Sequence, residues 1–255
     1  MTEKLEIQPI PGLDEVHHGD DLGAQIVAAA AVHGLEPGDG DVVVVSQKVV
    51  SKAEGRTRRL AEVEPGARAA QLAATLGKDP RIVELVLSES RRIVRASGGV
   101  LIVETHGGWI CANAGIDFSN VPGAETATLL PRDADASARL IRAQLSAACG
   151  ARPAIVVADS FGRPWRIGQT DVAIGCAGVV ALDDWRGRRD ALGDELSATA
   201  IAVADELAAA ADLAREKADR IPAVLIRGAA RWRTDDDGPG AAARLQRAAE
   251  EDLFR

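Results

Sequence analysis

The sequence predicts a mixed α/β fold, because short runs of β-branched residues alternate along the chain with longer helical patterns. Residues 42–45 are consecutive valines, and residues 154–158 form a second continuous apolar run. Such runs are typical of strands that are buried on both faces. Residues 201–217, rich in alanine and leucine, have the clearest helical pattern. We therefore expect mixed sheets with flanking helices.

The amino-terminal part of the chain is predicted to begin with a strand and then a helix. Residues 5–11 have the composition of a strand, and a polar loop follows them. Asp20 or Asp21 is a good N-cap for a helix over 22–33. A turn at 39–41 precedes the valine strand. Polar side chains then follow the end of that strand, a position where ligands often bind.

Two helices and a hairpin are predicted next. The helices cover 66–77 and 80–91, and Asp79-Pro80 begins the second, because proline is favoured in the first turn of a helix. Strands at 94–105 and 109–112 flank a Gly-Gly turn, which indicates a hairpin.

The second half of the chain starts with a loop at 113–123 that is rich in Gly, Asn, Asp and Ser. Further on, Gly175 and Gly178 interrupt an apolar stretch over 171–182, which predicts a strand that another backbone approaches closely. The remaining elements that we expect are strands at 126–130, 154–158 and 222–227, and helices at 134–148, 201–217 and 240–251.

Composition limits the classes of function. The chain has 255 residues, 47% of them hydrophobic, and we expect one domain over 1–255. A net charge of −8 and 3% aromatic residues argue against a nucleic-acid surface. No apolar run reaches the roughly 18 residues that span a bilayer, and the start lacks signal-peptide features, so we expect a cytoplasmic protein without membrane contact. Cys111, Cys149 and Cys176 form no CxxC pair and are expected to be buried thiols.

The segment most informative about chemistry is 159–171 (DSFGRPWRIGQTD), which directly follows a predicted buried strand. Asp159 and Ser160 offer oxygen ligands for a hard divalent cation. Arg163 and Arg166 can pair with phosphate or carboxylate in a bidentate manner. The alternative for this segment is an ordered loop of salt bridges without a ligand.

A second oxygen ligand is predicted at Asp117, in the loop at 113–123, where a turn aspartate is the alternative. Oxygen donors without His or Cys point to magnesium or manganese bridging phosphates. Lys48 and Lys52 can each place a point charge on a triphosphate, although a solvated surface lysine is the alternative for both. The GxxxxGK[ST] phosphate loop, HExxH and GxSxG motifs are absent.

Several segments together resemble the coenzyme F420-0:L-glutamate ligase family: 40–45 (GDVVVV) with 49–56 (VVSKAEGR), then 114–121 (AGIDFSNV), then 159–175 (DSFGRPWRIGQTDVAIG). Their order and spacing match, and the resemblance extends from about residue 5 to the last predicted helix. It implies a GTP-dependent acid–amino-acid ligase that adds L-glutamate, γ-linked on successive additions, to coenzyme F420-0. The expected products are F420-1 or F420-2, GDP and phosphate. It also implies two Mg²⁺ or Mn²⁺ ions, K⁺, and two interlocked subdomains in an intertwined homodimer.

The resemblance also assigns roles by position. Asp117, Asp159 and Ser160 are the implied metal ligands, and we predict catalytic roles for Asp117, Asp159, Arg163 and Arg166. The implied nucleotide contacts are Leu13, Asp14, Glu15, Val16, Gln47, Lys52 and Asn120.

The chain departs from the family pattern at two places. Many members carry a metal-binding glutamate just before the segment that here begins at Ile201, whereas this chain has Ala200. Asp205 or Glu206 could replace it only if the chain bends there. Many members also have a Thr-Ser pair where this chain has Ser46-Gln47. Some relatives carry a flavin-binding reductase-like domain after the ligase, and we expect that activity to be absent here.

Two other functions fit the same residues. One is a related GTP- and metal-dependent amide ligase with a different acceptor or amino acid, which the alanine at position 200 motivates. The other is a non-catalytic binder of a nucleotide or a deazaflavin, in which the aspartates are structural. The sequence leaves open the number of glutamates added, the acceptor variant and the physiological metal.

Overall fold

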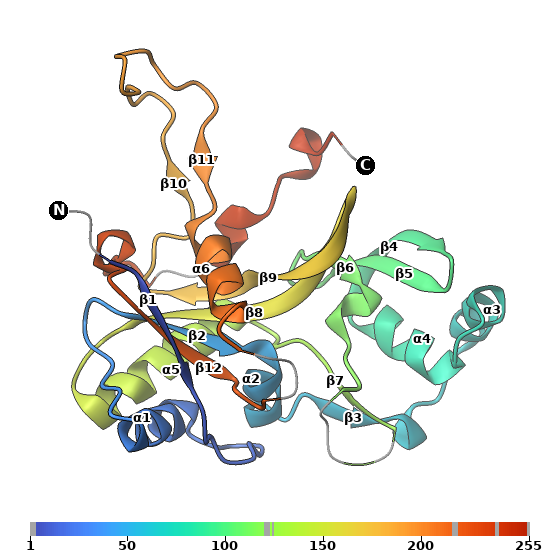
Figure 1. Ribbon diagram of the computed structural model, residues 1–255. Coiled ribbons are helices and arrows are strands. Elements are labelled where there is room, and N and C mark those ends of the chain that lie inside the picture. The colour runs from blue at the N-terminus through green and yellow to red at the C-terminus, as the bar shows by residue number, and fades with distance from the viewer. Residues whose placement is uncertain (1–3, 120–122, 124, 216–218, 238–239, 254–255) are drawn as a thin grey trace.

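The computed structural model describes residues 4–119, 123, 125–215, 219–237 and 240–253 (Figure 1). Its main feature is a five-stranded sheet in the order β1-β12-β2-β8-β9, in which β2 and β8 are parallel and the other neighbours are antiparallel. The strands are β1 (Glu6–Ile10), β2 (Val42–Ser46), β8 (Ala154–Arg163), β9 (Arg166–Ala177) and β12 (Ala223–Arg227). The predicted mixed α/β class is confirmed.

Helices cover both faces of this sheet, as Figure 1 shows. α1 (Leu22–Val32) and α5 (Ala134–Cys149) pack against one face, and α6 (Val203–Asp212) packs against the other. The β2 valines alternate between two cores, with Val43 and Val45 facing α1 and α5 and Val42 and Val44 facing α6. The prediction of a strand buried on both faces is therefore correct.

A smaller unit lies beside the main sheet. There α3 (Ala67–Leu76) and α4 (Pro80–Ser88) share a core with the sheet formed by β4 (Ser90–Ser97), β5 (Val100–Thr105) and β6 (Ile110–Ala112). A two-stranded ladder of β3 (Thr57–Arg59) and β7 (Thr126–Thr128) lies between the two units. The predicted caps hold, because Asp21 caps α1 and Asp79, followed by Pro80, caps α4.

Several local predictions were wrong. The strand predicted at 154–158 continues to Arg163, and the strand predicted over 171–182 is β9, which begins at Arg166, so residues 159–171 form a hairpin and not the loop given as the alternative. The segment after β2 forms a short helix, α2 (Gln47–Ala53), and α6 covers less than the predicted 201–217. The predicted last helix at 240–251 is replaced by 3₁₀ turns at Ala242–Leu245 and Ala249–Glu251. Cys149 is exposed, whereas the other two cysteines are buried as expected.

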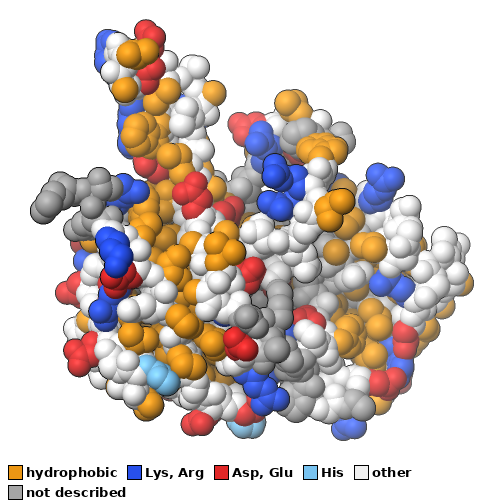
Figure 2. All heavy atoms as spheres, in the orientation of Figure 1, with side chains coloured by type: hydrophobic (Ala, Val, Ile, Leu, Met, Phe, Trp, Pro, Cys, Tyr) orange, Lys and Arg blue, Asp and Glu red, His pale blue; other side chains and the backbone are white. Residues whose placement is uncertain are grey.

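A projecting arm was not predicted. It is a hairpin whose short strands are β10 (Asp183–Asp184) and β11 (Ala200–Ile201), and it extends away from the main sheet in Figure 1. Figure 2 shows hydrophobic side chains along it, and Leu192 is 90% exposed. The other short elements are 3₁₀ turns at Leu60–Glu62, Asn113–Gly115 and Ala230–Trp232. Among the described helices, none combines the length and apolar character needed to cross a membrane.

The close backbone approach predicted at Gly175 is confirmed and gives a stability prediction. A Cβ added there would lie 2.2 Å from the carbonyl oxygen of Ala134, at the start of α5. We expect Gly175→Ala to lower the free energy of unfolding by about 2–4 kcal/mol, because the helix must move off the sheet. Thermal melting against Gly162→Ala, where no heavy atom lies within 4 Å of the added Cβ, provides the comparison. Equal melting temperatures for the two variants would contradict this packing argument.

Candidate active site

Strand ends gather the polar residues at one edge of the main sheet. Ser46 of β2 pairs with Ala158 of β8 in a parallel register, so the side chains that follow these residues emerge together. β1 ends at the same edge, and β12 begins there, with the Ser46 amide donating to the Pro222 carbonyl at 2.8 Å. This edge opens into a cavity of about 790 Å³, which is the candidate active site.

One wall of the cavity comes from the loop after β1 and from α2. The predicted nucleotide contacts Leu13, Asp14, Glu15, Val16, Gln47 and Lys52 all line it. Lys52 Nζ lies 2.6 Å from Glu15 Oε1, and the hydrogen bond from this lysine lowers the pKa of Glu15. The Gln47 side chain is buried, and its amide oxygen accepts from the Ser51 hydroxyl at 2.8 Å. Gln47 is therefore a fixed part of this wall.

A second wall holds Asp117 against a lysine. Lys48 Nζ lies 2.6 Å from Asp117 Oδ2 and also donates to the backbone carbonyl of Ser119 at 2.7 Å. The Ser119 amide donates to Asp117 Oδ1 at 2.7 Å. Burial alone would raise the pKa of Asp117, but the hydrogen bonds from Lys48 and Ser119 outweigh it and hold the pKa below its usual value. Asp117 is thus an ionised oxygen donor at the cavity wall.

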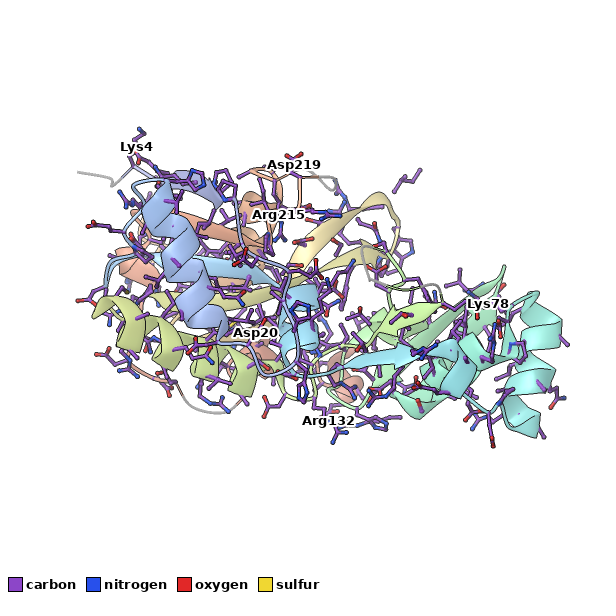
Figure 3. The ribbon with its side chains drawn as sticks, turned by 90° about the horizontal axis from the view of Figure 1, so that it is seen from below. Lys4, Asp20, Lys78, Arg132, Arg215 and Asp219 are labelled. Carbon is purple, nitrogen blue, oxygen red and sulfur yellow. The ribbon has the colours of Figure 1, made fainter. Side chains whose placement is uncertain are left out.

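The hairpin and the end of α6 supply a third wall. Ser160 and Asp171 are paired across β8 and β9, and the Ser160 hydroxyl donates to Asp171 Oδ1 at 2.6 Å. The other Asp171 oxygen accepts from Arg215 Nη2. Figure 3 shows Arg215 beside the β8–β9 hairpin. Arg215 and Asp212 both line the cavity, which extends the site to residues well beyond the sequence motifs.

Asp159 lies among these groups and is strongly perturbed. Burial raises its pKa to about 7, and the negative charges of Asp171 and Asp117 add to the shift. A carboxyl group with this pKa in a cleft is a typical feature of functional sites. Nearby cationic charge from a ligand or metal would favour its ionised form.

The residues present fit a divalent cation in donor type. Asp117, Asp159 and Ser160 offer only oxygen, which suits Mg²⁺ or Mn²⁺. In the described part of the chain, however, no group of three His, Cys, Asp or Glu side chains converges as a ready-made site. To ligate a cation, Asp117 would have to give up its contact with Lys48.

Other predicted residues lie elsewhere. Arg163 and Arg166 pair at the exposed tip of the hairpin and do not line the described cavity. Asn120 falls outside the described residues. Ala200 lies in β11 of the arm, so its side chain does not line the cavity, and a carboxylate missing there leaves the described lining unchanged. Asp205 accepts a hydrogen bond from the Ala173 amide and is not a lining residue.

Several lining residues had no assigned role from sequence. Asp171 is the last residue of the segment 159–171. It reaches the cavity because it pairs with Ser160 across β8 and β9, and this register cannot be read from the sequence. Ser119 is adjacent to Asn120 in the segment 114–121, but its residue type alone predicts no role. Asp212, Arg215 and Arg220 line the cavity from the end of α6 and the loop before β12, where no local pattern indicated a ligand.

Comparisons with known proteins identify the family of this chain. The model of the F420-0:gamma-glutamyl ligase family matches residues 12–228. The chain is 43% identical over 247 residues to coenzyme F420:L-glutamate ligase of Methanothermobacter thermautotrophicus, covering 96% of this chain and 97% of the relative. It is 43% identical over 252 residues to the ligase of that name from Methanopyrus kandleri, covering 98% of each chain. For the Archaeoglobus fulgidus ligase the identity is 41% over 255 residues, covering 99% of this chain and 97% of the relative. The chain therefore belongs to the F420-0:gamma-glutamyl ligase family.

Proposed function

We propose that this protein joins L-glutamate to coenzyme F420-0 and uses GTP and divalent metal ions to do so. The family assignment supports the ligase reaction. The observation that carries the nucleotide and metal parts is the cavity itself, because Lys48 and Lys52 line it together with Asp117 and Asp159. Cations and oxygen donors in one cleft suit a phosphate–metal complex.

The reaction needs an activated acceptor, because a carboxylate is a poor electrophile. GTP transfers its γ-phosphoryl group to the acceptor carboxylate, which gives GDP and an acyl phosphate. The amine of glutamate then attacks the acyl carbon, the C–N bond forms, and phosphate leaves as the C–O bond breaks. Lys48 and Lys52 would hold phosphate oxygens in line, and the carboxylates would accept the metal.

Asp117, Asp159 and Ser160 are the residues that would hold the metal ions. When bound, Mg²⁺ or Mn²⁺ supplies positive charge that neutralises the transferred phosphoryl group. K⁺, γ-linked successive additions and an intertwined homodimer are further parts of the proposal, and the projecting arm with its exposed Leu192 suits a contact with a second copy. A monomeric mass by light scattering would contradict the dimer.

The purified protein tests this proposal directly. Incubation with F420-0, GTP, Mn²⁺ and glutamate should give products heavier by one or more glutamyl groups, with GDP and phosphate released in equal amounts. Omitting GTP should abolish the product. Activity on another acceptor without any change of F420-0 would favour a ligase of different specificity, and nucleotide binding without phosphate release in every acceptor tested would favour a non-catalytic binder.

Removing the Lys52 ammonium should weaken the binding of GTP specifically. The Lys52 side chain is 11% exposed, and its ammonium forms an ion pair with Glu15 at the cavity wall. We expect Lys52→Ala to raise the KM for GTP about tenfold, equivalent to about 1.4 kcal/mol, because a phosphate contact is lost. Initial rates at varied GTP measure this effect. An unchanged KM for GTP with a lower melting temperature would make Lys52 a packing residue instead.

A further inference from the structure

We infer that Arg215 is a ligand-binding residue that donates one guanidinium nitrogen to an anionic oxygen of the bound substrates while another holds Asp171 in place. The inference rests on the proposed function, because it concerns the same cavity. Arg215 follows α6, whereas the site residues in the sequence motifs lie at strand ends, in loops and in α2, so it is a further cation of the same cavity.

The contacts of Arg215 leave one of its guanidinium nitrogens, Nη1, without an acceptor in the described part of the chain. Nη2 donates to Asp171, and Nε lies 3.8 Å from Asp212 Oδ1. Nη1 is buried, and among the described residues it has no hydrogen-bond partner. The side chain is 10% exposed and lines the cavity, so the nitrogen without a partner belongs to a cavity-wall residue.

A buried N–H without an acceptor destabilises the protein, so it is expected where a ligand supplies the acceptor. The guanidinium group is planar and rigid, so fixing Nη2 on Asp171 also fixes the direction of Nη1. Asp171 is itself only 2% exposed, so the carboxylate that holds the Arg215 guanidinium group is fixed by its surroundings. The result is a donor oriented before any ligand arrives.

Two other cations that line the cavity, the ammonium groups of Lys48 and Lys52, differ from Arg215 in this respect. Lys48 and Lys52 each place their ammonium on a carboxylate at 2.6 Å, and these contacts must rearrange when phosphate binds. Arg215 differs because its contact with Asp171 leaves Nη1 without an acceptor among the described residues. The matching ligand group is an anionic oxygen, from a phosphoryl group of the nucleotide or from a carboxylate of glutamate or of the acceptor.

Through Asp171, Arg215 also acts as a positioning residue for Ser160. The Ser160 hydroxyl donates its proton to Asp171 at 2.6 Å, so the lone pairs of its oxygen are directed to other sides. Because Arg215 holds Asp171 in place, it also fixes the acceptor of the Ser160 hydroxyl and so the orientation of that hydroxyl.

Arg215→Lys tests the inference, because a lysine can retain the contact with Asp171 but cannot present the second nitrogen of the fork. Calorimetric titrations would measure Kd for GDP with Mg²⁺, for L-glutamate and for F420-0. We expect Kd to rise about tenfold for the ligand that Nη1 contacts, while the other two change less than about twofold. A rise for GDP identifies a phosphoryl oxygen, and a rise for glutamate or F420-0 identifies that ligand's anionic group.

A second variant and a matched control keep the test decisive. Arg215→Gln keeps a donor for Asp171 without the charge and should show the same pattern with a larger loss. Arg81 also forms an ion pair with an aspartate, Asp79, at 2.6 Å, but it does not line the cavity. Arg81→Lys should therefore leave all three Kd values unchanged. If all three Kd values for Arg215→Lys stay within twofold of the wild type, the inference is overturned, whatever happens to the melting temperature.

Binding constants also separate this inference from the proposed function. They are measured without turnover, so a wild-type protein that binds GDP but adds no glutamate to F420-0 would contradict the proposed reaction alone. The comparison of Arg215→Lys with the wild type would still decide whether Nη1 binds an anion.

Discussion

Replacing Asp159 by asparagine should lower the turnover of glutamate ligation by about three orders of magnitude with the fold intact, because charge stabilisation through a metal is worth several kcal/mol. Asp159 follows the buried part of β8, and the charges of Asp117 and Asp171 both raise its pKa. Asparagine keeps the volume and removes the charge. Steady-state release of phosphate, together with amide formation, measures the loss.

A matched control exists on α6. Burial also raises the pKa of Asp205, but this residue accepts a hydrogen bond from the Ala173 amide and does not line the cavity. Asparagine can still accept that bond through its amide oxygen, so Asp205→Asn should turn over within about twofold of the wild type. If Asp159→Asn retained comparable turnover, the metal assignment would be refuted.

Asp159→Asn should also change the pH dependence of stability. The pKa of Asp159 is raised to about 7 in the folded protein, against about 3.9 in an unfolded chain. The folded state is therefore favoured at low pH, and this advantage is lost progressively as pH rises from about 4 to about 7. At pH 8 the ionised carboxylate opposes folding by on the order of 2–4 kcal/mol. With chelator present, Asp159→Asn should melt higher than the wild type at pH 8, and the gap should shrink towards pH 4.

The main sheet could be predicted because its signals are local. In β2 every position from 42 to 45 is a valine, and burial on two faces is the arrangement that covers them all. Asp79-Pro80 and Asp21 mark helix starts through contacts within a few residues. At Gly175 the sequence indicated a close approach, although not that α5 supplies the backbone.

Elements that leave the core could not be predicted in the same way. Beyond Ser160, the hairpin of β8 and β9 extends into solvent, so its residues lack the apolar alternation that identifies a strand. α2 has only seven residues, too few for a helical period to stand out. The prediction of a last helix was wrong because this segment forms short 3₁₀ turns. The amide of Ala242 donates a hydrogen bond to Asp135 of α5, a tertiary contact that the local pattern does not contain.

The site was predictable where strand ends carry it and not where tertiary contacts assemble it. Two parallel strands place the residues after Ser46 and Ala158 at one edge, which the motifs already suggested. Arg215 meets Asp171 only because α6 packs on β9, 44 positions away in sequence. Arg163 and Arg166 had the right chemistry for phosphate, but the twist of the hairpin places them at its exposed tip.

Divalent metal should bind about tenfold more weakly at pH 6 than at pH 8, and about another tenfold more weakly at pH 5. The reason is that Asp159, with a pKa of about 7 in the metal-free site, must lose its proton before it can ligate. Above pH 7 the carboxylate is already ionised and the affinity should level off. Asp117 adds little to this dependence, because its pKa lies below the usual value.

Titrating Mn²⁺ into the full chain between pH 5 and pH 8, followed by electron paramagnetic resonance of the free ion, measures the dependence without any turnover. Asp159→Asn provides the matched comparison, since it has no proton to lose and should bind Mn²⁺ weakly with little change over the same range. Because the wild-type slope below pH 7 reports one proton released per ion, a flat wild-type profile would mean that Asp159 does not ligate the metal. The cluster of Asp117, Asp159 and Ser160 would then have to be reassigned from metal binding to holding the loop that follows β6.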